Sequence, residues 1–112
     1  MLRWLLVALT LIAVAPAVAQ VRAGEIAVAA EGTEAWTYLR GLKDGIEWAV
    51  AQSRFDKEPP PFCPPPNLAI AAEQYRQILS DQIRRHPEQA RHFAGLVMMD
   101  ALKRTFPCSS KP

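Results

Sequence analysis

The sequence predicts an all-α fold, a small single-domain bundle of three to four helices closed by one disulfide. Three segments carry apolar residues at spacings of three and four, which is the pattern of a buried helical face. No segment alternates apolar and polar residues as a half-buried strand would. The third observation is a pair of cysteines, Cys63 and Cys108, in a chain that opens with an export signal.

The first 19 residues have the three parts of a cleavable signal peptide. A basic start with Arg3 is followed by a long, almost entirely apolar run and then by small residues. Ala17 and Ala19 occupy the −3 and −1 positions, so we predict cleavage between Ala19 and Gln20. A cut after Ala23 is the second choice.

A membrane anchor is the alternative reading of the same segment. A spanning helix needs about 20 apolar residues, and this run is shorter and contains Pro16. We therefore expect export by way of the signal peptide and a soluble mature protein.

Beyond the signal, the chain divides into three parts. Residues 20–32 have no clear periodicity and predict a flexible N-terminus. A helical domain is expected over 33–108 and a disordered tail over 109–112. The mature length of 93 residues suits one domain.

The first helix is expected to begin after Thr33, an N-cap residue, and to fade near Arg54 or Phe55. Gly41 and Gly45 would each weaken it by about 1 kcal/mol relative to alanine. Close approach of another helix would offset that cost. Its apolar stripe comprises Trp36, Leu39, Leu42, Ile46, Ala49 and Val50.

Trp48 lies off this stripe, together with Tyr38 and the two glycines. These residues mark a second face of the helix. That face indicates either packing on two sides or a dimer contact.

The next segment, 56–67, holds six prolines within eight positions and predicts a stiff, polyproline-like strap. A second helix is expected over 70–85, with Pro87 opening a further turn, and a last helix over 93–105. Their apolar stripes comprise Ala71, Ala72, Tyr75, Ile78, Leu79, Gln82 and Ile83 in the second helix, and Phe93, Leu96, Val97, Met98, Met99, Ala101 and Leu102 in the last.

Cys63 and Cys108 follow a signal peptide, and an even cysteine count in an exported chain indicates a disulfide. Closing the 46-residue loop between them would stabilise the fold by about 4 kcal/mol in the loop-entropy model. An intermolecular bridge in a dimer is the alternative. A zinc site is disfavoured because the short paired spacings of zinc ligands are missing.

Composition and motifs argue against nucleic-acid binding and enzymatic catalysis. The mature part has 12 basic and 11 acidic residues, far from a strongly basic domain. His86 and His92 are six residues apart and do not form the i,i+4 pair that binds zinc on one helix face, and Asp44 with Glu47 is expected on a solvated face. We predict no catalytic, cofactor-binding or metal-ligating residue and no cofactor.

Protein binding is the remaining expectation, and aromatic side chains dominate interface energies. Each of the aromatic residues concerned could also belong to the core. The candidate anchors are Trp36, Trp48, Phe55, Phe62 and Tyr75.

Several short patterns together resemble one known family over residues 33–108. The chain reads Tyr38-Leu39-x-Gly41-x-x-Asp44, then Phe62-Cys63-x-Pro65, His86-Pro87-Glu88 and finally Leu96-Val97-x-x-x-Ala101-Leu102-x-x-x-Phe106-Pro107-Cys108. In this order the patterns resemble the Rap/Tai family of immunity proteins associated with type VI secretion. The prolines on both sides of Cys63 are denser than that family's pattern.

The resemblance implies a periplasmic immunity protein that binds a secreted peptidoglycan amidase effector and inhibits it by occluding its active site. It implies a possible homodimer and a disulfide between Cys63 and Cys108, and it leaves the residues that contact the effector unknown. Two alternatives come from other classes. One is a periplasmic stress chaperone similar to HdeA, and the other is a structural subunit of an envelope complex.

Overall fold

The computed structural model describes residues 21–66 and 69–109. The predicted signal peptide, its cleavage site and the last three residues of the predicted tail lie outside this part. The helices are α1 (Ala23–Ala27), α2 (Glu34–Phe55), α3 (Ala72–Arg85), the short 3₁₀ helix η1 (Pro87–Arg91) and α4 (Ala94–Thr105).

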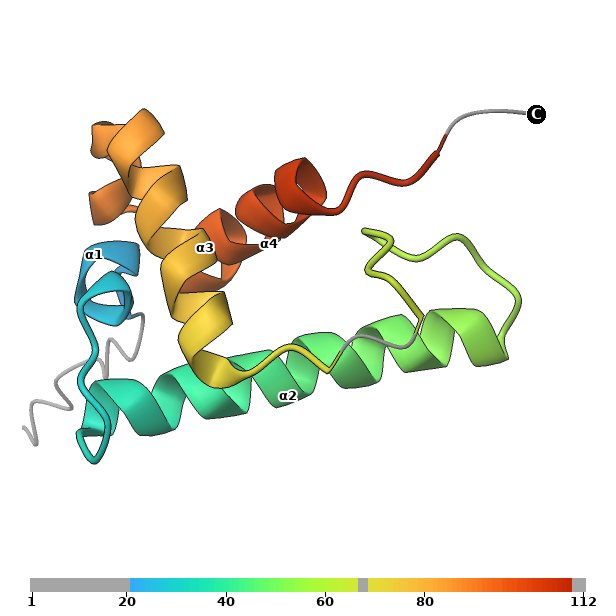
Figure 1. Ribbon diagram of the computed structural model, residues 1–112, viewed down its shortest axis with the longest axis horizontal. Coiled ribbons are helices and arrows are strands. Elements are labelled where there is room, and N and C mark those ends of the chain that lie inside the picture. The colour runs from blue at the N-terminus through green and yellow to red at the C-terminus, as the bar shows by residue number, and fades with distance from the viewer. Residues whose placement is uncertain (1–20, 67–68, 110–112) are drawn as a thin grey trace, which may run out of the picture.

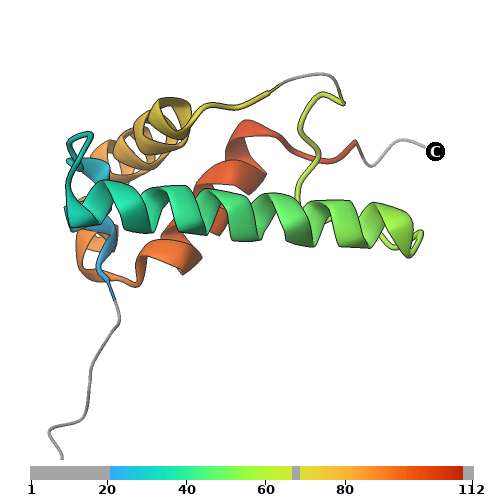
Figure 2. The ribbon, with the colours of Figure 1, turned by 90° about the horizontal axis from the view of Figure 1, so that it is seen from below.

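The predicted all-α class is confirmed. In the described part of the chain no strand occurs, and a single antiparallel bridge joins Arg22 to Phe93. The long helix α2 runs along one side of the domain and continues past the other helices, as Figures 1 and 2 show. Helix α1 packs against α3, η1 and α4, and α3 packs against α2 and α4.

Helix α2 begins and ends where its sequence predicts. The Thr33 hydroxyl accepts a hydrogen bond from the Trp36 N–H at 3.2 Å, which satisfies one free donor of the first turn. The helix ends at Phe55, and Lys57 then adopts a φ of 57° as the chain turns into the strap. Helices α3 and α4 begin two residues and one residue later than predicted, since Ala71 and Phe93 are their N-cap residues.

The core lies where α1, α3, α4 and the inner face of α2 meet. Between two and five buried apolar side chains from each of these helices fill it, and both side-chain polar atoms of Gln82, the single buried polar residue of the described part, are hydrogen-bonded. Its amide donates to Gln89 at 3.0 Å and accepts from Arg104 at 2.7 Å. The largest fully buried side chains are Ile26, Leu39, Phe62, Tyr75, Leu79, Val97, Met98 and Leu102.

The N-terminal segment differs from the flexible terminus expected over 20–32. Within this segment, α1 packs against the rest of the domain, with Ala23 and Ile26 completely buried. The Ala27 carbonyl accepts a hydrogen bond from Arg76 of α3 at 2.9 Å. A five-residue helix is too short for its buried side chains to form a periodic pattern, so the sequence carried no signal of it.

The strap is held at the middle of its proline-rich run, and the predicted disulfide closes it within the chain. The Cα atoms of Cys63 and Cys108 are 4.8 Å apart in the disulfide. The Cys63 N–H donates to the Phe106 carbonyl at 2.9 Å. Phe62, only 1% exposed, anchors the strap in the core.

Candidate protein-binding site

The residues considered for chemistry do not gather into a site. His86 and His92 are both exposed. Across residues 21–66 and 69–109, no group of three or more His, Cys, Asp or Glu side chains could hold a metal ion. Asp44 and Glu47 both pair with Lys43, at 3.7 and 3.1 Å, as residues of a solvated face.

Within those same ranges, no helix is both long enough and apolar enough to cross a membrane.

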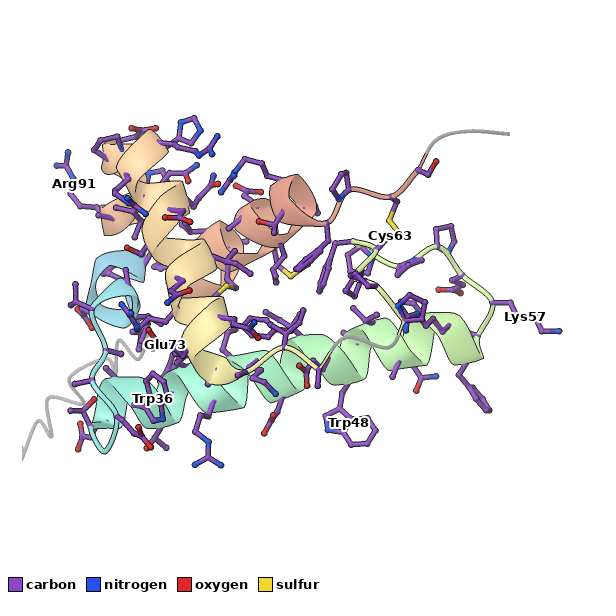
Figure 3. All side chains as sticks on the ribbon, in the orientation of Figure 1. Trp36, Trp48, Lys57, Cys63, Glu73 and Arg91 are labelled. Atoms are coloured by element: carbon purple, nitrogen blue, oxygen red, sulfur yellow. A yellow bond between two sulfur atoms is a disulfide. The ribbon has the colours of Figure 1, made fainter. Side chains whose placement is uncertain are left out.

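The aromatic candidates separate into core and surface residues. Phe62 and Tyr75 are each 1% exposed and belong to the core, and Trp36 is half-buried against it. Trp48 and Phe55 are 76% and 84% exposed. Of the five predicted anchors, these two are therefore free to contact another protein, and Figure 3 shows Trp48 pointing away from the domain.

Tyr75 is instead a structural link between α3 and α2. Its hydroxyl donates a hydrogen bond to the Glu47 carboxylate at 3.3 Å. Burial, followed by the nearby negative charge of Glu47, raises the pKa of Tyr75 above its ordinary value. The neutral phenol is therefore the form that the fold requires.

One exposed apolar surface, the α2 outer face, consists of Gly41, Gly45, Trp48 and Phe55. A Cβ atom added at either glycine would meet nothing within 4 Å. The expectation that another helix of the same chain approaches these glycines is therefore wrong for the described residues. The glycines weaken α2 without any packing gain from the residues that the structure describes.

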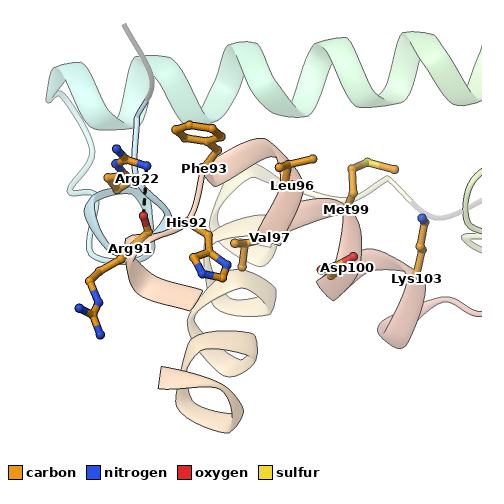
Figure 4. Close-up of a pocket in the computed structure, with 9 residues that line it drawn as sticks. All are labelled: Arg22, Arg91, His92, Phe93, Leu96, Val97, Met99, Asp100 and Lys103. Carbon is orange, nitrogen blue, oxygen red and sulfur yellow. Dashed lines mark hydrogen bonds between the residues drawn. The ribbon is translucent and has the colours of Figure 1, made fainter. Parts of the chain in front are cut away.

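A second exposed apolar surface, the α4 groove, lies along the outer side of α4. It has a volume of about 630 Å³. Phe93, Leu96 and Met99 supply its apolar floor, and Figure 4 shows them in a row along α4. Phe93 is 38% and Leu96 66% exposed. The residues that line the groove are Arg22, Arg91, His92, Phe93, Leu96, Val97, Met99, Asp100 and Lys103.

The N-terminal segment builds one wall of this groove. The Ala23 N–H donates to the His92 carbonyl at 2.9 Å, and the Ala94 N–H donates to the Val21 carbonyl at 2.8 Å. Between these bonds, the Arg22 guanidinium lies 4.7 Å from the centroid of the Phe93 ring. It also donates to the Arg91 carbonyl at 3.2 Å, the bond drawn in Figure 4.

The charges around the groove are unbalanced. Arg22, Arg91 and Lys103 are cationic, and Asp100 is the one carboxylate among the lining residues. Among the described residues no ion pair engages Arg91, Asp100 or Lys103. The groove therefore presents free positive charge beside apolar surface.

Periodicity alone placed Phe93 and Leu96 with the core residues of the last helix. In the structure the core face of α4 is complete without them. The sequence did contain a sign that some of these residues would be exposed. The segment has more apolar residues than one face of a 12-residue helix can bury. The face toward the core consists of Ala94, Val97, Met98, Ala101 and Leu102.

Comparisons with known proteins place this scaffold in a family. No curated protein and no solved structure matches the chain. The family described as Rap1a immunity proteins matches residues 15–108, which include α1, all the later helices and both cysteines of the disulfide. Because this match covers most of the 112 residues, the chain belongs to the Rap1a family of immunity proteins.

Proposed function

We propose that this protein protects its cell by binding a type VI secreted peptidoglycan amidase and occluding the active site of that enzyme. The observation that carries the proposal is the family match over residues 15–108, which implies an immunity protein for a secreted effector protein. The exposed apolar side chains on α2 and α4 support direct binding, because such surfaces mark protein contacts. Inhibition then needs no chemistry from this chain.

The periplasm is the compartment that this proposal requires, because the wall-cutting effector acts there. Two features support it. Residues 1–19 have the sequence pattern expected of a signal peptide, and a disulfide such as Cys63–Cys108 persists in an oxidising compartment. Cleavage after Ala19 would also keep Val21 and Arg22, which bond to the segment before α4.

Self-association is the third part of the proposal, with the α2 outer face as the contact between two copies. Trp48 and Phe55 offer large apolar side chains on one helix face, and Gly41 and Gly45 leave space for a close neighbour. Burying such aromatic side chains supplies much of the energy of a typical interface.

The test first looks for a secreted peptidoglycan amidase encoded next to this protein, which would be its cognate effector, and then titrates that amidase with the purified mature chain. Peptidoglycan hydrolysis should fall to the background rate at a near-stoichiometric ratio. Full hydrolase activity in the presence of excess mature protein would rule out the immunity function against that enzyme. An unrelated peptidoglycan hydrolase is the control and should keep its activity.

A further inference from the structure

Two residues of the apolar floor of the α4 groove, Phe93 and Leu96, remain exposed outside the core of the fold. Helix α4 buries a complete inner face against the core, while Phe93, Leu96 and Met99 line the groove on its other side. Leu96 is 66% exposed and points away from that inner face. A large apolar side chain left in water at a groove is available to a partner, because its transfer out of water is favourable.

The groove is also held in shape before any partner arrives. Backbone hydrogen bonds fix residues 21–23 to 92–94 on both sides of Arg22. The Arg22 guanidinium covers the Phe93 ring and is itself tied to the Arg91 carbonyl. A surface that is ordered in the free protein loses little conformational entropy on binding.

The free charges indicate the chemistry of the partner. Arg91 and Lys103 stand near opposite ends of the groove, as Figure 4 shows, and neither has a carboxylate partner in the described chain. With Arg22 they outnumber the single acidic residue, Asp100. Positive charge at the rim of an apolar surface attracts carboxylates of a partner and repels basic segments.

We propose that the α4 groove is the effector-binding surface, and that it receives a segment of the effector in which an apolar side chain is flanked by Asp or Glu residues. In this arrangement the apolar side chain packs on Leu96 and Met99, and the carboxylates pair with Arg91 and Lys103. This inference rests on the proposed immunity function and adds to it the surface that binds the effector.

The experiment measures binding of the purified mature protein to the cognate amidase by calorimetry, at about 50 and 300 mM NaCl. Leu96→Asp places a charge at the centre of the groove and should weaken binding at least about 30-fold, the effect of a hot-spot residue. Leu96→Ala should weaken it less. The double variant Arg91→Glu/Lys103→Glu should weaken binding at least about 10-fold at low salt and flatten its salt dependence.

The matched control is Arg40→Glu/Arg54→Glu on α2. It makes the same change in net charge, and Arg54 lies in the last turn of α2 as Lys103 does in α4. This control should bind the amidase as the unmodified protein does. Circular dichroism and thermal midpoints establish that every variant is folded.

The possible outcomes distinguish the proposed immunity function from the proposed role of the α4 groove. If the unmodified protein does not bind the amidase, the proposed function fails and this inference fails with it. If it binds, and Leu96→Asp and the double variant bind equally well, the groove is not the effector surface although the immunity function stands. If Leu96→Asp instead separates a dimer into monomers without changing amidase affinity, the groove holds a second copy and the proposal is overturned.

Discussion

The α4 groove and the α2 outer face both expose large apolar side chains, yet their surroundings differ. At the groove, Arg91 and Lys103 have no acidic partner in the described chain. Beside the α2 outer face, Asp44 already pairs with Lys43, and Asp56 accepts a hydrogen bond from Gln52 at 2.9 Å. Unpaired charge suits a partner of opposite charge, and an apolar face with locally paired charges suits a second copy of the same helix.

The two surfaces also differ in how they are supported. Backbone bonds from the N-terminal segment brace the groove, whereas the α2 outer face lies on a helix that runs past the rest of the bundle. The strap covers the inner side of that projecting part of α2 and is itself held by the disulfide. Met99 lies between the surfaces, since it lines both the α4 groove and a hollow beside Gly41 and Gly45.

Removal of the disulfide should have the largest effect, because it frees the strap that supports α2. Cys63→Ser/Cys108→Ser should lower the free energy of unfolding by about 4 kcal/mol or less, as expected for the loop that it closes. Urea denaturation of the mature protein measures this change, and the reduced unmodified protein should match the double variant. An unchanged urea midpoint would show that the strap is held by Phe62 packing alone.

Trp48→Asp should affect self-association without affecting amidase binding, and so show that the two surfaces have different functions. It places a carboxylate on the α2 outer face and should weaken self-association at least about 10-fold, while amidase binding stays unchanged. Light scattering during size-exclusion chromatography, over a range of protein concentrations, measures the first effect. Leu96→Asp is the reciprocal control and should leave self-association as it was. Loss of amidase binding by Trp48→Asp would assign the effector to the α2 outer face instead.

A smaller effect should come from substitution of Tyr75, whose hydroxyl links α3 to the helix that carries the α2 outer face. Its pKa is raised in the folded state, so the unfolded chain loses this proton first, near pH 10. The contribution of Tyr75 to stability is therefore complete below pH 10 and declines as the pH rises above that value.

The midpoints of urea denaturation, measured between pH 8 and 11, test whether stability falls in this direction. The midpoint of the unmodified protein should fall as the pH passes 10, and Tyr75→Phe should reduce that fall. At pH 8, Tyr75→Phe should cost about 1 kcal/mol, the typical worth of its hydrogen bond to Glu47. Tyr38→Phe, at the more exposed tyrosine, is the control. An equal alkaline fall in Tyr75→Phe and the unmodified protein would contradict the assignment.

Much of the scaffold was predictable because long helices leave periodic patterns and clear ends. Thr33, Pro87 and Pro107 mark boundaries that the structure keeps to within two residues. Helix α1 was not predictable, since one turn of helix has no period to detect and its burial depends on Arg76 and other partners distant in sequence.

The α4 groove was missed for a related reason. Periodicity assigns Phe93 and Leu96 to an apolar stripe, but it cannot tell which side of a broad stripe the other helices cover. That outcome depends on how α1 and α3 pack against α4. The α2 outer face was easier to find, because Trp48 lies off the apolar stripe of its helix, on the side that carries Gly41 and Gly45.

The most direct test of the account is oxidative footprinting of the mature protein with and without the cognate amidase. Hydroxyl radicals oxidise exposed Met, Trp, Phe and Leu side chains, so one experiment measures the exposure of both surfaces. The account predicts that the amidase protects Phe93, Leu96 and Met99, and that raising the concentration of the protein alone protects Trp48 and Phe55. Protection of Trp48 and Phe55 by the amidase, with Phe93, Leu96 and Met99 unchanged, would contradict it.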